Sequence, residues 1–157
     1  MITDNSQWEA LTTPGYCWYD NDEAEYKGTY GGLYNSYTVQ TGKLCTAGWH
    51  VSTDENWTTL TTYLGGESVA GSKLKETGTN HWFGPNTDAT NSSGFAALPG
   101  GERVPSFGWF DVYGYYWSIP ENDPGNFLCR IMYNSYSMVE RNLTGGYVGI
   151  SVRCVKD

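Results

Sequence analysis

The feature that most constrains this chain is an alternation of side chains near its C-terminal end, between Arg130 and Arg141. A strand directs successive side chains to opposite faces of a sheet, so the two interleaved sets must face different surroundings. The spacing of two breaks once, at Asn134-Ser135, where a pair of strands can turn or bulge. We expect one set to serve the fold and the other to face something outside it. The first set reads Arg130, Met132, Asn134, Ser137, Val139 and Arg141, and the second reads Ile131, Tyr133, Tyr136, Met138 and Glu140.

Length and composition indicate a single compact domain over residues 1–157. The 25 aromatic residues (7 Trp, 13 Tyr and 5 Phe), together with 20 Gly, favour short strands, turns and packed loops over a helical bundle. A net charge of −8 argues against a nucleic-acid or anionic-membrane partner, because both require basic patches. No apolar run is long enough to span a membrane, and the first ten residues do not resemble a signal peptide. We therefore expect either a protein used inside a cell or virus particle, or an excised mature domain.

Two short helices are predicted in the middle of the chain. The first begins at Ser52 or Thr53, either of which can cap it, and ends at the glycine pair 65–66. A second, weaker helix is expected over 67–77. The predicted core residues of this region and of the following strands are Trp49, Trp57, Leu60, Leu64 and Trp117.

Strands are predicted at residues 14–20 and 31–39, where aromatic and β-branched residues lie between glycines and acidic residues. Residues 78–114 are rich in Gly, Pro, Asn and Ser and are expected to form long packed loops. A terminal set of short strands follows. This order predicts an α+β fold with two short helices and a small twisted antiparallel sheet.

Candidate catalytic groups are few. His50 and His81 are the only histidines, and neither has a metal-ligand spacing to cysteines or carboxylates. We therefore predict no catalytic residue, no metal site and no cofactor. The four cysteines allow three pairings; Cys45 and Cys154 occupy framework-like positions and could meet, whereas a reducing compartment would leave every cysteine as a thiol.

Several blocks of the sequence resemble the Fibrobacter succinogenes major paralogous domain family. They are the run from Tyr30 to Trp82 and the later segments TNSSGFAALPGGER, YGYYWS and GISVRCVKD. The resemblance extends from about Tyr16 to the end of the chain and implies a C-type-lectin-like fold, with a ligand face on the last sheet and its loops. Where the family reads Glu, this chain has Asn56, which removes the reciprocal arm of a capping box if Thr53 is the cap, although Ser52 with Glu55 could replace it.

In many members of that family the C-terminal segment looks like the target of a diversity-generating retroelement, which rewrites the adenines of an asparagine-rich template. Aligned with such a template, residues 115–148 become a variable ligand-binding region. The expected function is then that of a non-enzymatic, receptor- or adhesin-type protein of a bacterium or phage. The resemblance implies these ligand-binding residues: Tyr115, Ile119, Asn122, Asp123, Asn126, Cys129, Ile131, Tyr133, Tyr136, Met138, Glu140, Asn142, Leu143, Thr144, Tyr147 and Val148.

The expected partner is a protein or glycan on a cell surface, and the expected location is a cell surface, the secreted fraction or a phage particle. Two alternatives stay open. One is an oxidase of the formylglycine-generating type, which needs reactive thiols near the ligand face, where only Cys129 lies; the other is a structural surface module without a specific ligand. We predict that Cys45 and Cys154 lie close enough for a bridge if the protein is exported.

The recognition hypothesis also predicts exposure. One contiguous exposed patch should contain Ile131, Tyr133, Tyr136, Tyr147 and Val148. In contrast, Met132, Val139 and Val152 should point inward.

Overall fold

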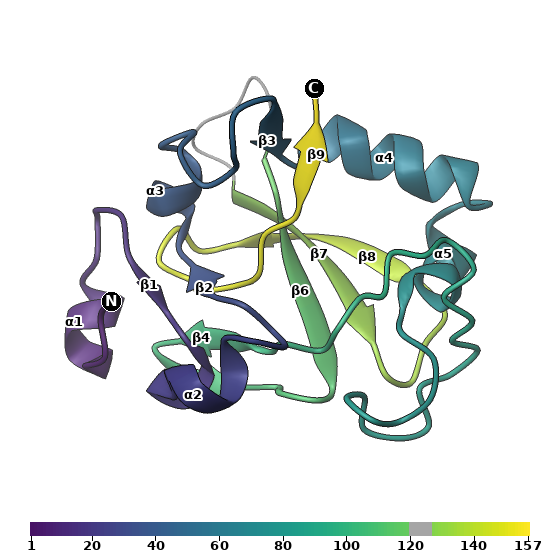
Figure 1. Cartoon of the computed structure of the whole chain (residues 1–157), viewed down its shortest axis with the longest axis horizontal. Coiled ribbons are helices and arrows are strands. Elements are labelled where there is room, and N and C mark those ends of the chain that lie inside the picture. Colours follow the sequence, from purple (N-terminus) through teal and green to yellow (C-terminus); the bar gives the residue numbers. More distant parts are fainter. Residues whose placement is uncertain (120–126) are drawn as a thin grey trace.

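The computed structural model describes residues 1–119 and 127–157, so the predicted binding residues Asn122, Asp123 and Asn126 lie outside the described part. Within that part the chain forms five short α-helices, one 3-10 turn and four small antiparallel sheets (Figure 1). The expected mixture of short helices and antiparallel strands is confirmed, with more helices than the two predicted. The elements are α1 (Asn5–Glu9), β1 (Tyr16–Cys17), the 3-10 turn (Tyr19–Asn21), α2 (Glu23–Tyr26), β2 (Leu33–Tyr34), α3 (Ser36–Val39), β3 (Trp49–Val51), α4 (Asp54–Tyr63), α5 (Glu67–Leu74), β4 (Glu102–Val104), β5 (Ser106–Gly108), β6 (Tyr113–Ser118), β7 (Phe127–Tyr133), β8 (Val139–Thr144) and β9 (Cys154–Lys156).

The first predicted helix is α4, and its start shows how the sequence specifies it. The Thr53 side chain accepts a hydrogen bond from the Asn56 main-chain N–H, and the Asn56 side chain accepts one from the Thr53 N–H. The capping box is therefore complete, and the expectation that Asn56 removes its second arm is wrong, because the shorter amide still reaches the main chain. Trp57 and Leu64 are buried as predicted, whereas Leu60 is half-buried.

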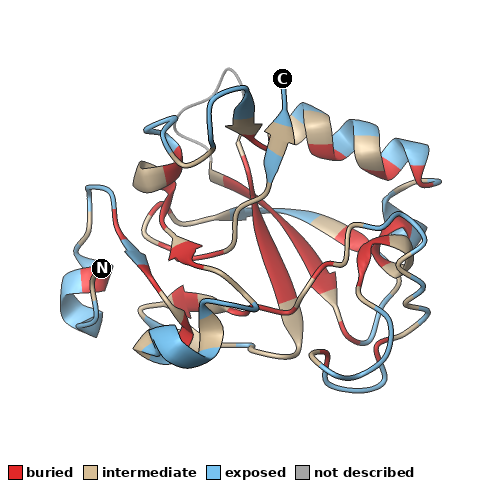
Figure 2. Ribbon diagram, viewed as in Figure 1, coloured by how far each residue is buried: buried red, intermediate tan, exposed pale blue. Residues whose placement is uncertain are grey.

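A three-stranded antiparallel sheet in the order β6-β7-β8 lies at the centre of the molecule. Strands β7 and β8 form the predicted hairpin, with the turn after Asn134. Strand β7 is central, and all of its residues except the first and last are buried (Figure 2). Met132 packs toward α4 and α5 in one core cluster, and Ile131 packs into a second cluster on the opposite face. The sheet is thus buried on both sides along β6 and β7.

Strands β3 and β9 form a separate two-stranded sheet that joins the middle of the chain to its end. Next to it, the sulfur atoms of Cys45 and Cys154 are bonded, with their Cα atoms 5.9 Å apart, which confirms the predicted pairing. Trp49 lies on β3 and is 45% exposed, so its prediction as a core residue is wrong. A two-stranded sheet offers less cover than the central sheet, and the Trp49 ring faces solvent.

Two other expectations are corrected. The strand predicted at 31–39 is only the short β2, because Asn35 then caps helix α3 by accepting a hydrogen bond from the Thr38 N–H. The loops predicted over 78–114 contain the hairpin of β4 and β5. None of the helices in the described ranges has the length and apolar character needed to cross a bilayer.

Helix α5 lies directly against the main chain of the β7–β8 turn. The buried Lys75, just after this helix, donates hydrogen bonds from Nζ to the main-chain oxygens of Tyr133 and Tyr136, at 2.9 Å each. The Ser72 N–H donates to the Ser137 main-chain oxygen at 3.0 Å. A Cβ atom added at Gly71 would lie 2.3 Å from a main-chain oxygen of the turn, so only glycine permits this approach.

Candidate ligand-binding surface

The predicted binding residues divide by the strand that carries them. Tyr115, Cys129, Ile131 and Val148 are buried, with at most 9% of their surface exposed. They belong to the second core cluster, because β7 is the inner strand of the sheet, isolated bridges to Gly101 and Ser151 flank β6, and the segment after β8 folds over them. The expected exposure of Ile131 and Val148 is therefore wrong. The half-buried members are Ile119, Tyr133, Glu140, Thr144 and Tyr147, and the exposed members are Tyr136, Met138, Asn142 and Leu143.

The inward-facing set behaves as predicted. Met132 and Val139 are fully buried, and Val152 is partly buried against the second cluster. The alternation along β7 therefore separates two cores rather than a core from solvent. Among residues 1–119 and 127–157, the predicted binding residues that are exposed lie only on β8, an edge strand, and in the turn before it.

Four aromatic side chains form a connected row at the turn end of the central sheet. Trp109 stacks on Tyr113 with ring centroids 4.8 Å apart, Tyr113 meets Tyr133 at 4.9 Å, and Tyr133 meets Tyr136 at 5.6 Å. The two outer rings, those of Trp109 and Tyr136, are 54% and 57% exposed. We call Trp109, Tyr113, Tyr133 and Tyr136 the aromatic row.

The sheet register fixes the middle of the aromatic row. Tyr113 on β6 and Tyr133 on β7 are directly opposed residues, so their rings lie on the same face. The Tyr133 hydroxyl donates to the Glu140 carboxylate on β8. Burial, followed by this hydrogen bond and the charge of Glu140, raises the pKa of Tyr133 above its usual value, so the phenol stays neutral. The row therefore combines apolar rings with a carboxylate at its edge.

The outer ends of the row stand on turns. Trp109 follows β5 and has a positive φ of 57°, a conformation that is rare for tryptophan and tends to occur where function requires it. Trp109 and Tyr113 belong to the segment at residues 78–114 whose predicted role was only that of packed loops. The sequence signal that pointed to them was the cluster of aromatic residues around the start of β6, but nothing in this cluster indicated that Tyr113 contacts Tyr133.

The free thiols do not form a reactive pair. Cys17 and Cys129 are both buried and belong to different core clusters. Burial raises the pKa of Cys129 to about 12 and also raises the pKa of Cys17. Since the thiolate is the nucleophile and the metal ligand, neither residue has the form that redox or copper chemistry requires. In residues 1–119 and 127–157, no three His, Cys, Asp or Glu side chains are grouped so that they could hold a metal ion.

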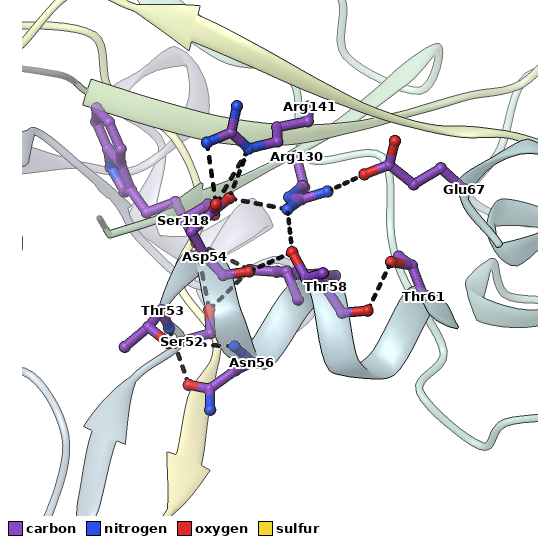
Figure 3. A network of polar contacts seen from close by, with 12 residues as sticks. Ser52, Thr53, Asp54, Asn56, Thr58, Thr61, Glu67, Ser118, Arg130 and Arg141 are labelled. Atoms are coloured by element: carbon purple, nitrogen blue, oxygen red, sulfur yellow. Dashed lines mark hydrogen bonds and ion pairs between the residues drawn. The ribbon is translucent and has the colours of Figure 1, made fainter. Parts of the chain in front are cut away.

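A charged network supports the other face of the sheet (Figure 3). The buried Arg130 guanidinium donates to Asp54 at 2.8 Å and to Glu67 at 2.5 Å, and Arg141 makes a two-pronged contact with Asp54. Burial acts to raise the pKa of Asp54, but the hydrogen bonds from Arg141 and the charge of Arg130 outweigh it and hold this pKa below 3.8. The network joins α4 and α5 to β7 and β8, which is a structural role.

Of three comparisons with known proteins, one found a match. Searches of the curated proteins and of the solved structures found no match to this chain. The family model described as the Fibrobacter succinogenes major domain matches residues 2–156, which is nearly the whole chain. The resemblance of its sequence blocks and this match agree, and the chain belongs to the Fibrobacter succinogenes major domain family.

Proposed function

We propose that this protein is a non-enzymatic ligand-binding protein of the receptor or adhesin type. The observation that carries the proposal is the aromatic row, in which Trp109 and Tyr136 expose more than half of their surface and Tyr133 donates to the carboxylate of Glu140. Tyrosine and tryptophan offer large contact areas with few rotatable bonds, and they are the usual anchors of recognition surfaces. Met138 in the turn and Asn142, which lies on the same face of β8 as Glu140, are exposed and extend this surface. The exposed Leu143 lies on the opposite face of β8.

More specifically, we propose that the protein has a C-type-lectin-like fold and that a retroelement in a bacterium or phage diversifies its C-terminal face. It rests on the family resemblance. Because Tyr115, Cys129, Ile131 and Val148 are buried, variation among the described residues would alter recognition mainly on β8, in its turn and in the aromatic row. The genomic neighbourhood tests this part: a reverse-transcriptase gene next to a near-copy of the codons for residues 115–148 supports it, and the absence of both contradicts it.

A binding experiment tests the function itself. The partner is proposed to be a protein or glycan on a cell surface, so the probe is a panel of intact bacterial cells, with binding of the fluorescently labelled protein measured by flow cytometry. The variant Trp109→Asn/Tyr136→Ser removes both outer rings, and asparagine suits the positive φ at position 109. Since each aromatic anchor contributes about 2 kcal/mol, binding should weaken at least about tenfold.

The matched control is Tyr63→Ser, which removes a tyrosine that is 86% exposed on α4, outside the aromatic row. This control should bind as the wild type does, and both variants should unfold within about 0.5 kcal/mol per substitution of the wild type. Treating the cells with periodate or with protease distinguishes a glycan from a protein partner. Undiminished binding by the double variant contradicts the proposal, and a wild type that binds no cell in the panel supports a structural surface module instead.

The oxidase alternative has its own assay. The separate burial of Cys17 and Cys129 supports the absence of turnover. We expect no oxidation product when copper and a cysteine-containing peptide are added to the protein. Mass-spectrometric detection of formylglycine in that peptide would overturn the proposal of a non-enzymatic protein.

A further inference from the structure

We propose that the cleft between α4 and β9 binds a small carboxylate that carries an apolar group, with the Arg153 guanidinium as the charged partner. The cleft has a volume of about 210 Å³ and lies away from the aromatic row. Its lining residues are Ser52, Asn56, Trp57, Leu60, Phe95, Arg153, Cys154 and Val155. This inference does not depend on the function proposed above.

Arg153 differs from the other three arginines of the chain in its partners. Arg130 and Arg141 are paired with carboxylates, and the buried Arg103 donates to main-chain and asparagine oxygens around the N-terminal segment. Arg153 has no carboxylate within 4.0 Å among residues 1–119 and 127–157, and its Nη2 lies 3.5 Å from two main-chain oxygens, the limit of a hydrogen bond. Its Nε is buried without a hydrogen-bond partner in the same ranges.

The arginine is nevertheless held firmly at the cleft. Its guanidinium carbon lies 4.7 Å from the Phe95 ring centroid and 5.7 Å from that of Tyr116, so two aromatic faces orient it. Its main-chain oxygen accepts from the Ser52 N–H at 2.8 Å, and the next residue, Cys154, is disulfide-bonded. A partly buried guanidinium that has no carboxylate partner and whose Nη2 makes only long hydrogen bonds, mounted on rigid main chain, is a preorganised anion partner.

The remaining lining residues define the ligand. Asn56 uses its side-chain oxygen in the capping box, and its NH₂ group makes no hydrogen bond in the described part of the chain, so it can donate to an anion. Trp57, Leu60 and Phe95 supply aromatic and aliphatic walls. The chain carries a net charge of −8, so its overall field repels anions and retention depends on this local cation. A planar carboxylate with a small apolar body, such as benzoate, matches both the donors and the walls.

The test uses sodium benzoate as the probe and benzamide, its uncharged analogue of similar shape, as the comparison. Titration is followed by NMR at the Trp57 indole N–H and the Arg153 Nε–H. Benzoate should shift both signals saturably, and benzamide should bind at least about tenfold more weakly, because it cannot form charge-assisted hydrogen bonds with the guanidinium. Sodium chloride at equal ionic strength should not reproduce the shifts.

Two variants and two controls sharpen the result. Arg153→Gln should weaken benzoate binding at least about tenfold, whereas Arg141→Gln, with the same change of net charge, should not. Because Arg153 also packs on Phe95, Leu60→Trp provides an independent variant, which narrows the cleft from the α4 side and should also abolish binding. Trp109→Asn/Tyr136→Ser should bind benzoate normally, which separates this site from the aromatic row. The inference is overturned if benzoate causes no saturable shift, or if benzamide binds as well as benzoate. It is also overturned if sodium chloride causes the same shifts, or if folded Arg153→Gln binds benzoate as the wild type does.

Discussion

Replacing Asp54 by asparagine tests how the charged network stabilises the fold. The Asp54 carboxylate accepts hydrogen bonds from Arg130, Arg141 and Ser118, and the Arg130 side chain is completely buried. Asparagine removes the charge and replaces one of the two acceptor oxygens by an NH₂ group. Among the described residues, the only carboxylate then left to Arg130 is that of Glu67, which is half exposed.

The expected loss of stability depends on which of the two ion pairs of Asp54, with Arg130 or with Arg141, is buried. The contact with Arg141 is partly exposed and is worth about 0.5 kcal/mol. Breaking a buried ion pair by removing one partner costs about 3–5 kcal/mol, and the remaining Glu67 places this case at the lower end. We therefore expect Asp54→Asn to lower the free energy of unfolding by about 3 kcal/mol, which corresponds to a fall in melting temperature of roughly 6–12 °C for a chain of this size.

Urea unfolding at neutral pH, followed by tryptophan fluorescence, measures this loss. The control is Glu55→Gln, the same charge change in the same helical turn, which should alter stability by less than about 0.5 kcal/mol. The pKa of Asp54 is below 3.8 in the folded state. The ionised carboxylate therefore stabilises the fold fully above that pH, and this stabilisation is lost as the pH falls through the folded-state pKa. The difference between wild type and Asp54→Asn should therefore shrink in acid. A variant within 1 kcal/mol of wild type, a limit of about one third of the expected loss, would refute the reasoning.

Two further substitutions test the packing and the covalent frame. A Gly→Ala change in an exposed helix stabilises a protein by about 1 kcal/mol. Gly71→Ala should instead destabilise this protein by about 1–3 kcal/mol, because the added Cβ would overlap the main chain of the β7–β8 turn. Chemical denaturation measures the difference from the control Gly28→Ala, where an added Cβ contacts no other atom. The double variant Cys45→Ser/Cys154→Ser opens a closed loop of 109 residues and should lower stability by about 4–5 kcal/mol on the chain-entropy model; an unchanged denaturation midpoint would show that the bridge contributes nothing.

Local signals in the sequence were sufficient to predict α4 and α5, but not the short helices α1, α2 and α3. Capping residues, first-turn acids and a glycine stop lie within a few positions of one another, so α4 was predictable without knowledge of its partners. The β7–β8 turn was likewise visible as a break in the period of two. Asn56 shows the limit of pattern matching, since an asparagine makes the same reciprocal hydrogen bond as the expected glutamate.

The candidate surface was less predictable because exposure depends on neighbours that are distant in sequence. Period-two alternation identifies two faces of a strand but does not reveal whether a second layer covers one of them. Ile131 and Cys129 are buried since β7 lies between two strands and beneath the segment around Val148. The same cause hid the aromatic row, because Tyr113, on which Trp109 stacks, meets Tyr133 only through the pairing of β6 with β7.

The contact of α5 with the β7–β8 turn has a consequence for how this protein can change. Lys75, Ser72 and Gly71 all meet main-chain atoms of residues 133–138, and main-chain atoms are the same whatever side chains the turn carries. The turn is therefore held in place by contacts that impose no requirement on the identity of Ser135, Tyr136 or Met138. A library that randomises these three positions should yield mostly folded proteins with a common backbone, which makes the turn a suitable place for laboratory selection of new binding specificities.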